Sequence, residues 1–244
     1  MGTRGLYGFR KGNIDKTTYN HWDSYYSGLG KAFIKFLKVV PPEKLSKFYD
    51  RIELKKAKSE PTVEEIEICK KAGYYNNKVS DNSEKDWYCL LHNLQSNFKE
   101  YKILVDYPKR PVYMIDNHGF IKDSLFCEYA YIYDIDKEVL EVYLGYQTKP
   151  QVGNRYGTEV DNGYYPCALI VEIPYKKVKR YDINFLIEMM LFHTTDEEVI
   201  DVIEEIMKEK GIDFHEISTL IEDLDLMEDG IKPEEFKEKI EKYL

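Results

Sequence analysis

Two short N-terminal segments hold the residue types that perform acid–base chemistry and bind anions. Residues 17–23 read TTYNHWD, in which His21 and Asp23 stand two positions apart. At the end of a strand this spacing puts both side chains on one face, where the imidazole and the carboxylate form an orienter–base pair or half of a metal site. Thr3 and Arg4, in the segment MGTRGLYGFR, add a hydroxyl and a guanidinium fork that suits phosphate or carboxylate. These residues predict a catalytic site, with Arg4 binding substrate.

Residues next to these four are expected to line the predicted site. Flat aromatic surfaces suit a base or another ring, and the segment supplies Tyr19, Trp22, Tyr25 and Tyr26. Gly28 and Gly30 let the backbone approach a ligand closely, and the N-terminus of the following helix favours an anion. We place Asn20 in the same ligand-binding set.

A carboxylate farther along the chain is a further candidate. Glu128 falls on the apolar face of a predicted strand, among Phe126, Ala130 and Ile132. A carboxylate on such a face needs a partner, and Arg4 or Tyr19 would serve. If that face is solvated instead, Glu128 has no such role.

The elements that position these residues can be predicted from local signals. Residues 3–10 and 14–20 read as two strands joined by a tight turn at Lys11-Gly12-Asn13. Ser27 is the expected N-cap of a helix that ends at Pro41-Pro42, where another begins. Three further helices have start signals at Thr62 with Glu65, at Ser83 and at Thr195 with Glu198, and Gly73 and Gly211 stop the first and the last. The helix after Ser83 carries an apolar stripe from residue 87 to residue 98.

The middle of the chain is rich in strand signals. Segments 110–116, 124–134, 139–146 and 167–174 read as strands, with 124–134 and 139–146 forming an antiparallel hairpin. Residues 148–165 form a long loop, a class that is often functional. The order of hairpin, helices, antiparallel strands and helices predicts an α+β fold with a largely antiparallel sheet. We expect an α+β core domain over residues 1–180 and an acidic helical subdomain over 181–244.

Charge is distributed unevenly along the 244 residues. Residues 181–244 contain 20 acidic and 6 basic side chains, a net charge of −14, which leaves +5 for residues 1–180 of a chain with a formal net charge of −9. The acidic end would repel nucleic acid, so a nucleic-acid partner is not expected. No apolar run has the length of a membrane span and no signal peptide is evident, so we expect a cytoplasmic protein.

The sequence points to no cofactor or metal. It has no G-x-G-x-x-G after a strand and no P-loop, and its four cysteines lack zinc-site spacing and read as reduced and buried. Segment 223–236 resembles a calcium loop, but two of its ligand positions cannot coordinate the ion. His92 and His118 read as a solvent-facing helix residue and a turn residue. A metal site that joins His118 to His21 and Asp23 has no support from local spacing.

The N-terminal pattern resembles a set of uncharacterised phage and bacterial proteins that share an N-terminal Thr-Arg and a His-x-Asp-Gly-Tyr-Pro-x-Gly-x-Gly stretch. The resemblance covers about the first 30 residues, and the matching positions are Thr3, Arg4, His21, Asp23, Tyr25, Gly28 and Gly30. Ser24 and Tyr26 depart from the pattern, where it has Gly and Pro. The resemblance implies a shared site and a viral or mobile-element origin.

A looser resemblance is to N-terminal-nucleophile hydrolases. Those enzymes begin with a strand whose first residue attacks the substrate, and antiparallel strands similar to 128–134 and 139–145 follow. Removal of the initiator Met here would expose Gly2, which has no side-chain nucleophile, so Thr3 would serve only after a second cleavage.

Two functions remain open from the sequence. One is a hydrolase or transferase that acts on a small anionic, amide or nucleotide-like substrate, with His21 as acid or base, Asp23 as its orienter, and Thr3 lining the site or attacking. The other is a non-catalytic, phage-type binding protein that sequesters a ligand or inhibits a host protein.

Overall fold

A central five-stranded sheet organises the molecule. The computed structural model describes residues 2–72, 85–94, 97–106, 109, 111–223 and 231–244. In sheet order the strands are β2 (Ile14–Asn20), β1 (Gly5–Lys11), β5 (Tyr129–Asp134), β6 (Val139–Leu144) and β7 (Ala168–Pro174). Only the β1–β5 pair in this sheet is parallel. The expected α+β fold with a largely antiparallel sheet is therefore confirmed.

The N-terminal hairpin forms as predicted, with one change at its start. Gly12 and Asn13 form the turn at φ values of 57° and 64°, as a tight I′ hairpin turn requires. The first strand begins at Gly5 rather than at Thr3. The backbone at Thr3 and Arg4 is instead bonded to Ser24 and Glu128, which lie outside the hairpin ladder.

The predicted strand over 124–134 is shorter than expected. It begins at Tyr129, because the backbone carbonyl of Asp123 accepts hydrogen bonds from the N–H groups of Phe126 and Cys127 and folds this segment into a turn. The hairpin of β5 with β6 is confirmed, as is the last strand. Residues 148–165 form a loop, closed at its base by the bridge between Gln147 and Tyr165.

Helices follow the predicted order but differ in several boundaries. They are η1 (Tyr26–Gly30), α1 (Lys31–Val39), α2 (Pro42–Asp50), α3 (Val63–Ala72), α4 (Trp87–Leu91), η2 (His92–Leu94), α5 (Phe98–Asp106), η3 (His118–Lys122), α6 (Tyr175–Arg180), α7 (Ile183–Leu191), α8 (Glu197–Lys210), α9 (Phe214–Asp223) and α10 (Pro233–Glu241).

Ser27 does not cap α1, because a single π-helical turn, η1, precedes that helix and includes this residue. The capping box of Thr62 with Glu65 is confirmed by reciprocal bonds of 2.7 and 3.2 Å. Asp196, one residue after Thr195, caps α8, and Gly211 ends it at a φ of 70°. The expected signals at Gly73 and Ser83 lie outside the described residues.

The stripe from residue 87 to residue 98 belongs to more than one element. α4 ends at Leu91, a short 3-10 turn follows, and Phe98 begins α5. A small second sheet lies nearby, in which β3 (Ile52–Lys55) pairs in parallel with β4 (Val112–Ile115). β4 falls inside the predicted strand 110–116, whereas β3 has no counterpart among the sequence-based predictions.

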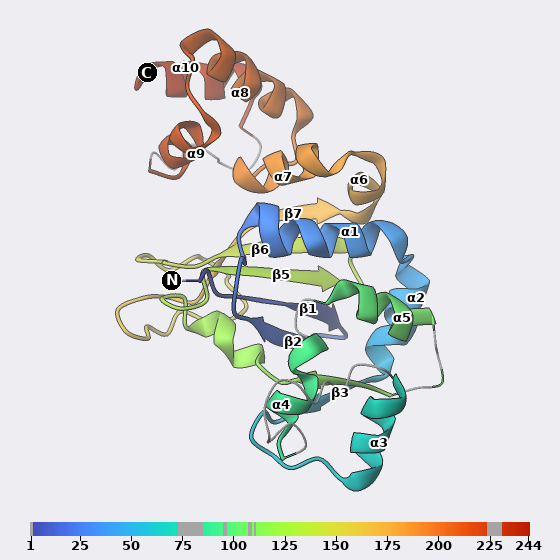
Figure 1. The fold of residues 1–244 in the computed structure, drawn as a ribbon. Coiled ribbons are helices and arrows are strands. Elements are labelled where there is room, and N and C mark those ends of the chain that lie inside the picture. The colour runs from blue at the N-terminus through green and yellow to red at the C-terminus, as the bar shows by residue number, and fades with distance from the viewer. Residues whose placement is uncertain (1, 73–84, 95–96, 107–108, 110, 224–230) are drawn as a thin grey trace.

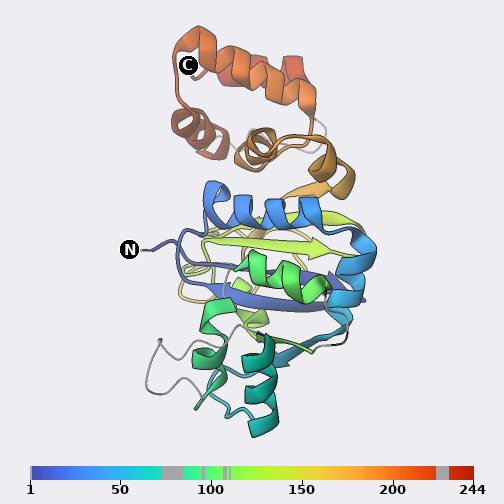
Figure 2. The same cartoon turned by 45° about the vertical axis from the view of Figure 1, so that its right-hand side comes forward.

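The two faces of the central sheet are covered differently. α1 and α5 pack on one face, where a cluster of edge-to-face aromatic rings includes Tyr7, Phe9, Phe33 and Phe98 (Figure 1). The other face holds a smaller apolar cluster, which includes Leu6 and Cys127, and Tyr156 of the loop 148–165 packs against it. The small sheet with α3 and α4 lies beside β2 (Figure 2).

The C-terminal helices lie beyond β7 (Figure 1). α7 contacts α1 and β7, and its Leu186, Met189 and Met190 are fully buried in the main core. The division into a core domain and an acidic subdomain stays a prediction. Among the described residues, no helix combines the length and the apolar composition that a membrane crossing needs.

Candidate functional site

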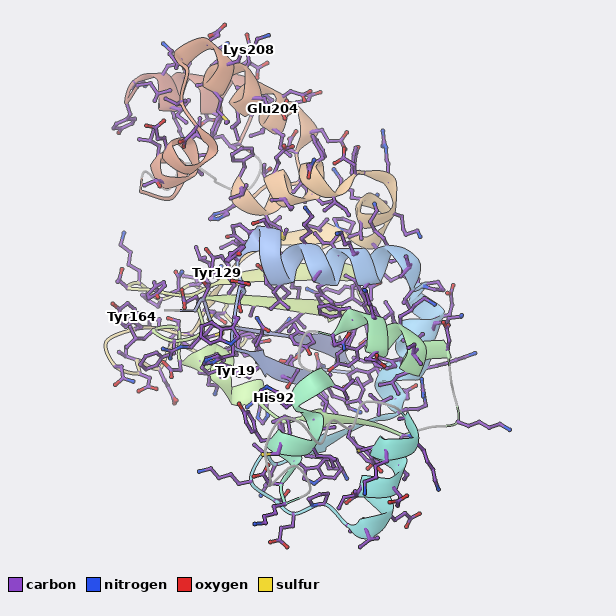
Figure 3. The ribbon with its side chains drawn as sticks, in the orientation of Figure 1. Tyr19, His92, Tyr129, Tyr164, Glu204 and Lys208 are labelled. Carbon is purple, nitrogen blue, oxygen red and sulfur yellow. The ribbon has the colours of Figure 1, made fainter. Side chains whose placement is uncertain are left out.

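Residues singled out from the sequence gather at one end of the central sheet. The start of β1, the end of β2, the start of β5 and the end of β6 meet there, as the register pairs of Gly5 with Asn20 and of Tyr129 with Leu144 require. Figure 3 shows Tyr19, Tyr129 and Tyr164 at this end of the sheet. We call this region the hairpin-end site and define it by Thr3, Arg4, Tyr19, His21, Asp23, Phe126, Glu128 and Tyr146.

Hydrogen bonds fix the backbone of Arg4, whereas the N–H donors of its guanidinium group remain available. Its N–H donates to Oε1 of Glu128 at 3.0 Å, and its carbonyl accepts from the N–H of Glu128 at 3.1 Å. The guanidinium carbon lies 4.8 Å from the centroid of the Phe126 ring. Within the described part of the chain this guanidinium forms no ion pair and no hydrogen bond. A positioned cation therefore remains able to bind a ligand.

Glu128 has the partners that its position requires. Arg4 is one of the two expected partners, although the bond comes from its backbone N–H. Burial, the negative charge of Glu128 and a hydrogen bond to that carboxylate raise the pKa of Tyr146, whereas the charge of Arg4 opposes the rise. Tyr146 lies just beyond β6 and has a φ of 57°. The sequence analysis did not single it out.

His21 is oriented by Tyr19 rather than by Asp23. The Tyr19 hydroxyl lies 2.6 Å from Nδ1 of His21, and the Tyr19 ring meets the edge of Phe120 with centroids 5.1 Å apart. Burial raises the pKa of Tyr19, against the opposing charge of Arg4, so its hydroxyl stays protonated at neutral pH. The His21 side chain is exposed, which leaves Nε2 accessible.

Asp23 does not join His21 in the expected pair. The strand ends at Asn20, so the alternation that would place both side chains on one face does not reach these positions. Asp23 has a φ of 54° and is exposed, and its carboxylate forms no hydrogen bond within the described residues. Its backbone carbonyl accepts from the N–H of Leu29 at 2.8 Å.

The aromatic residues of the segment divide between surface and interior. Trp22 and Tyr25 are 62% and 39% exposed, and the edge of the Trp22 ring lies against His21 with centroids 4.4 Å apart. Tyr26 is buried against Tyr129. Trp22 therefore exposes a flat surface beside His21, and Tyr25 exposes another, whereas Tyr26 belongs to the core.

Asn20 and the two glycines hold the turn in place. Asn20 is buried, and its amide donates to the Ser24 hydroxyl at 2.7 Å. A Cβ at Gly28 would lie 2.1 Å from the carbonyl oxygen of Asp23, and one at Gly30 would lie 2.9 Å from the Tyr131 ring. The close approach that these glycines permit is therefore to the protein's own atoms.

Thr3 is half-buried beside this turn. Its carbonyl accepts from the N–H of Ser24 at 3.2 Å, and the carbonyl of Ser24 accepts from the Tyr131 hydroxyl at 2.9 Å. Ser24 and Tyr131, both fully buried, anchor the turn and were missed by the sequence analysis. The contact with Tyr131, more than 100 residues away in the sequence, is a part of this role that no local signal contains.

The other histidines lie in other settings. Nδ1 of His118 is 2.7 Å from a carboxylate oxygen of Asp116, at the start of η3. His92 is half-buried with its ring edge on Tyr88, which corrects its assignment as a solvent-facing residue. In the described part of the chain, no group of three or more His, Cys, Asp and Glu side chains is arranged to hold a metal ion.

Comparison of the chain with models of protein families, with curated proteins and with solved structures finds no match. The resemblances drawn from the N-terminal motif therefore stay predictions.

Proposed function

We propose that the hairpin-end site binds a small molecule that carries an anionic group, and that the protein is a hydrolase or transferase acting on this molecule. The observation that carries the proposal is the guanidinium of Arg4, which is stacked on Phe126 and has no ion-pair partner among the described residues. A fixed guanidinium fork binds carboxylate or phosphate with two parallel hydrogen bonds.

The residues around Arg4 supply the remaining functions. Nδ1 of His21 is engaged by Tyr19, so Nε2 is the atom that accepts or donates a proton. The ring of Trp22 lies against this imidazole, and the exposed rings of Trp22 and Tyr25 suit a planar part of the ligand. The Thr3 hydroxyl lines the site or attacks the ligand.

One observation favours the alternative, a non-catalytic binding protein. Asp23 does not reach His21, so the expected orienter–base pair is not formed, while Tyr19 is a neutral orienter. A site of this kind can hold a ligand without turning it over. The acidic C-terminal helices would then suit a basic protein partner.

A thermal-shift screen tests the binding step. Wild type, Arg4→Gln and Lys35→Gln are each measured with nucleotides, cyclic nucleotides, amino acids, glutamine-like amides and divalent metals. Lys35 is an exposed cation on α1 and is the matched control for loss of one positive charge. A ligand at 100 times its Kd stabilises by about 2.7 kcal/mol, a shift of roughly 5–10 °C for a chain of this size. We expect this shift in wild type and Lys35→Gln and its loss in Arg4→Gln.

The proposal is wrong if no ligand shifts the wild-type protein, or if the shift persists in Arg4→Gln. For a ligand that binds, product formation separates the two functions. Turnover that is lost in His21→Gln with binding retained supports the enzyme, and binding without turnover supports the alternative.

A further inference from the structure

The charges around Arg4 restrict which anionic ligand the hairpin-end site can take. Glu128 is bonded to the Arg4 backbone, and Asp123 directly precedes the turn that carries Phe126. Oδ1 of Asp123 is buried and has no hydrogen-bond partner in the described part of the chain. Burial raises the pKa of Asp123, the neighbouring charge of Asp161 raises it further, and the charge of Arg4 lowers it. Glu128 and Asp123 therefore lie near Arg4, and Asp161 lies near Asp123.

Asp161 belongs to the long loop, four residues before the bridge at Tyr165 that closes its base. Its N–H and carbonyl each form a 2.9 Å hydrogen bond with the backbone of Tyr164. The Tyr164 ring meets the ring of Tyr146 with centroids 6.3 Å apart, and Gly145, the residue before Tyr146, donates its backbone N–H to the carbonyl of Glu128 at 2.8 Å. A continuous path of contacts thus runs from Arg4 through Glu128, Tyr146 and Tyr164 to Asp161.

This surrounding charge decides between the classes of anion. A phosphate or another polyanion would gain one guanidinium and meet repulsion from the nearby carboxylates. A ligand with a single carboxylate suffers less repulsion, and one that also carries a cation is attracted by both parts of the site. The faces of Tyr146 and Tyr164 add to this preference, since electron-rich rings attract ammonium groups.

We infer that the ligand of the hairpin-end site is a small zwitterion of the amino-acid class, with its carboxylate on Arg4 and its ammonium group facing the carboxylates of Glu128 and Asp161. The inference rests on the proposed function and narrows its substrate class. Of the anionic, amide and nucleotide-like substrates expected from the sequence, it favours the amides over the nucleotides. The ammonium group lies beside the paired rings of Tyr146 and Tyr164, on the loop side of Arg4.

Isothermal titration with four probes tests the ligand class: L-glutamine, N-acetyl-L-glutamine, L-glutamine amide and inorganic phosphate. The acetyl group removes the ammonium charge, and the amide removes the carboxylate. Because charge-assisted hydrogen bonds contribute about 1.5–3 kcal/mol, losing either group is expected to weaken binding about tenfold or more relative to glutamine. Phosphate is expected to bind more weakly than glutamine.

Two variants locate the ammonium group. Asp161→Asn removes the charge and keeps the backbone bonds of the loop, and Glu159→Gln is the matched control, an exposed acid in the same loop. We expect Asp161→Asn to weaken glutamine by about tenfold while leaving N-acetyl-glutamine unchanged, and Glu159→Gln to change neither.

Failure of the inference can be told apart from failure of the proposed function. If glutamine and its N-acetyl form bind equally well and Arg4→Gln abolishes both, the zwitterion is wrong and the anion site stands. Tighter binding of phosphate than of glutamine would also show that the zwitterion is wrong and that the anion site stands. If none of the four probes binds, the inference is overturned, and the screen against the other ligands decides the proposed function separately.

Discussion

At the scale of single residues, the sequence identified side chains better than it identified their partners. Arg4, Tyr19, His21 and Glu128 were chosen because of the chemistry of their side chains, and they lie together at one end of the sheet. Which of them bond to each other depends on where a strand ends. A strand that continued to Asp23 would have kept the expected alternation. Because it ends at Asn20, His21 contacts Tyr19 instead of Asp23.

Tyr146 could not have been found from a local signal. It follows β6 and lies 18 residues from Glu128 along the chain, and it reaches that carboxylate only because β5 and β6 pair antiparallel. Its positive φ is a property of the folded backbone, and the neighbouring residues in the sequence do not predict it. Phe126 is a similar case, because its ring becomes a platform for Arg4 through the turn at Asp123.

The Tyr19 hydroxyl determines the tautomer of His21, and this can be tested directly. With its pKa raised by burial, the hydroxyl keeps its proton, and it can either donate to Nδ1 or accept from Nδ1–H. The base role proposed for Nε2 requires the second arrangement, with the proton of the neutral imidazole on Nδ1. We expect 15N NMR at neutral pH to show a protonated Nδ1 in wild type and a mixture of tautomers in Tyr19→Phe. His118, bonded to Asp116, is the internal control and is expected to be unchanged. Identical His21 spectra in both proteins would contradict this role.

At the scale of elements, local signals set by a backbone requirement were confirmed at three places, whereas the caps expected at Ser27 and Thr195 were wrong. The turn at Gly12-Asn13, the capping box at Thr62 and the stop at Gly211 are each set by a local backbone requirement, and each was predicted correctly. The missed strand β3 has only four residues, and its pairing with β4 spans some 60 positions. Pairing over such a distance depends on the tertiary fold, which no short pattern contains.

A buried ion pair fastens the long loop to the sheet. Glu141 of β6 is fully buried, and Arg155 of the loop donates to both of its carboxylate oxygens, at 2.6 Å for the first. The Tyr143 hydroxyl also donates to Glu141, and Tyr156 donates to Asp15 of β2. Because Tyr164 of the same loop contacts Tyr146, the ion pair helps to position one wall of the hairpin-end site.

Removing one partner of this pair is expected to destabilise the fold. Arg155→Met leaves Glu141 buried without its main partner, at a cost of about 3 kcal/mol or more in the free energy of unfolding. Urea denaturation measures the loss. The double variant Arg155→Met with Glu141→Leu removes both charges and is expected to recover a large part of it. Equal losses in the single and the double variant would show that the packing of Arg155, and not the unpaired carboxylate, is responsible.

At the scale of the whole molecule, the acidic C-terminal helices share the main core with the sheet. Buried side chains of α7 and α8, such as Met189, Ile200 and Ile203, belong to the same apolar cluster as those of α1 and β7. Asp182 and Asp196 cap α7 and α8, so part of the negative charge of this region serves its own helices. Composition predicted that the region is helical and acidic, but it could not predict which apolar face packs against the sheet.

His193, between α7 and α8, should make the stability of the whole chain sensitive to acid. Burial lowers its pKa from 6.5 to about 4 in the folded protein. The unfolded chain therefore binds a proton at a higher pH than the folded one, so this contribution to stability is complete above pH 6.5 and is lost as the pH falls toward 4. The loss between pH 7 and pH 4 amounts to roughly 3 kcal/mol.

A matched variant separates this effect from the titration of the carboxylates. His193 has a φ of 52°, which asparagine tolerates well, so His193→Asn removes the titrating ring without straining the backbone. We expect urea unfolding at pH 7, 6, 5 and 4 to show a free energy of unfolding that falls more steeply in wild type than in His193→Asn. The two curves should diverge below pH 6.5, because every other titrating group is common to both proteins. Parallel curves would mean that the imidazole is protonated in the folded protein at no extra cost, and that the junction of α7 and α8 admits solvent.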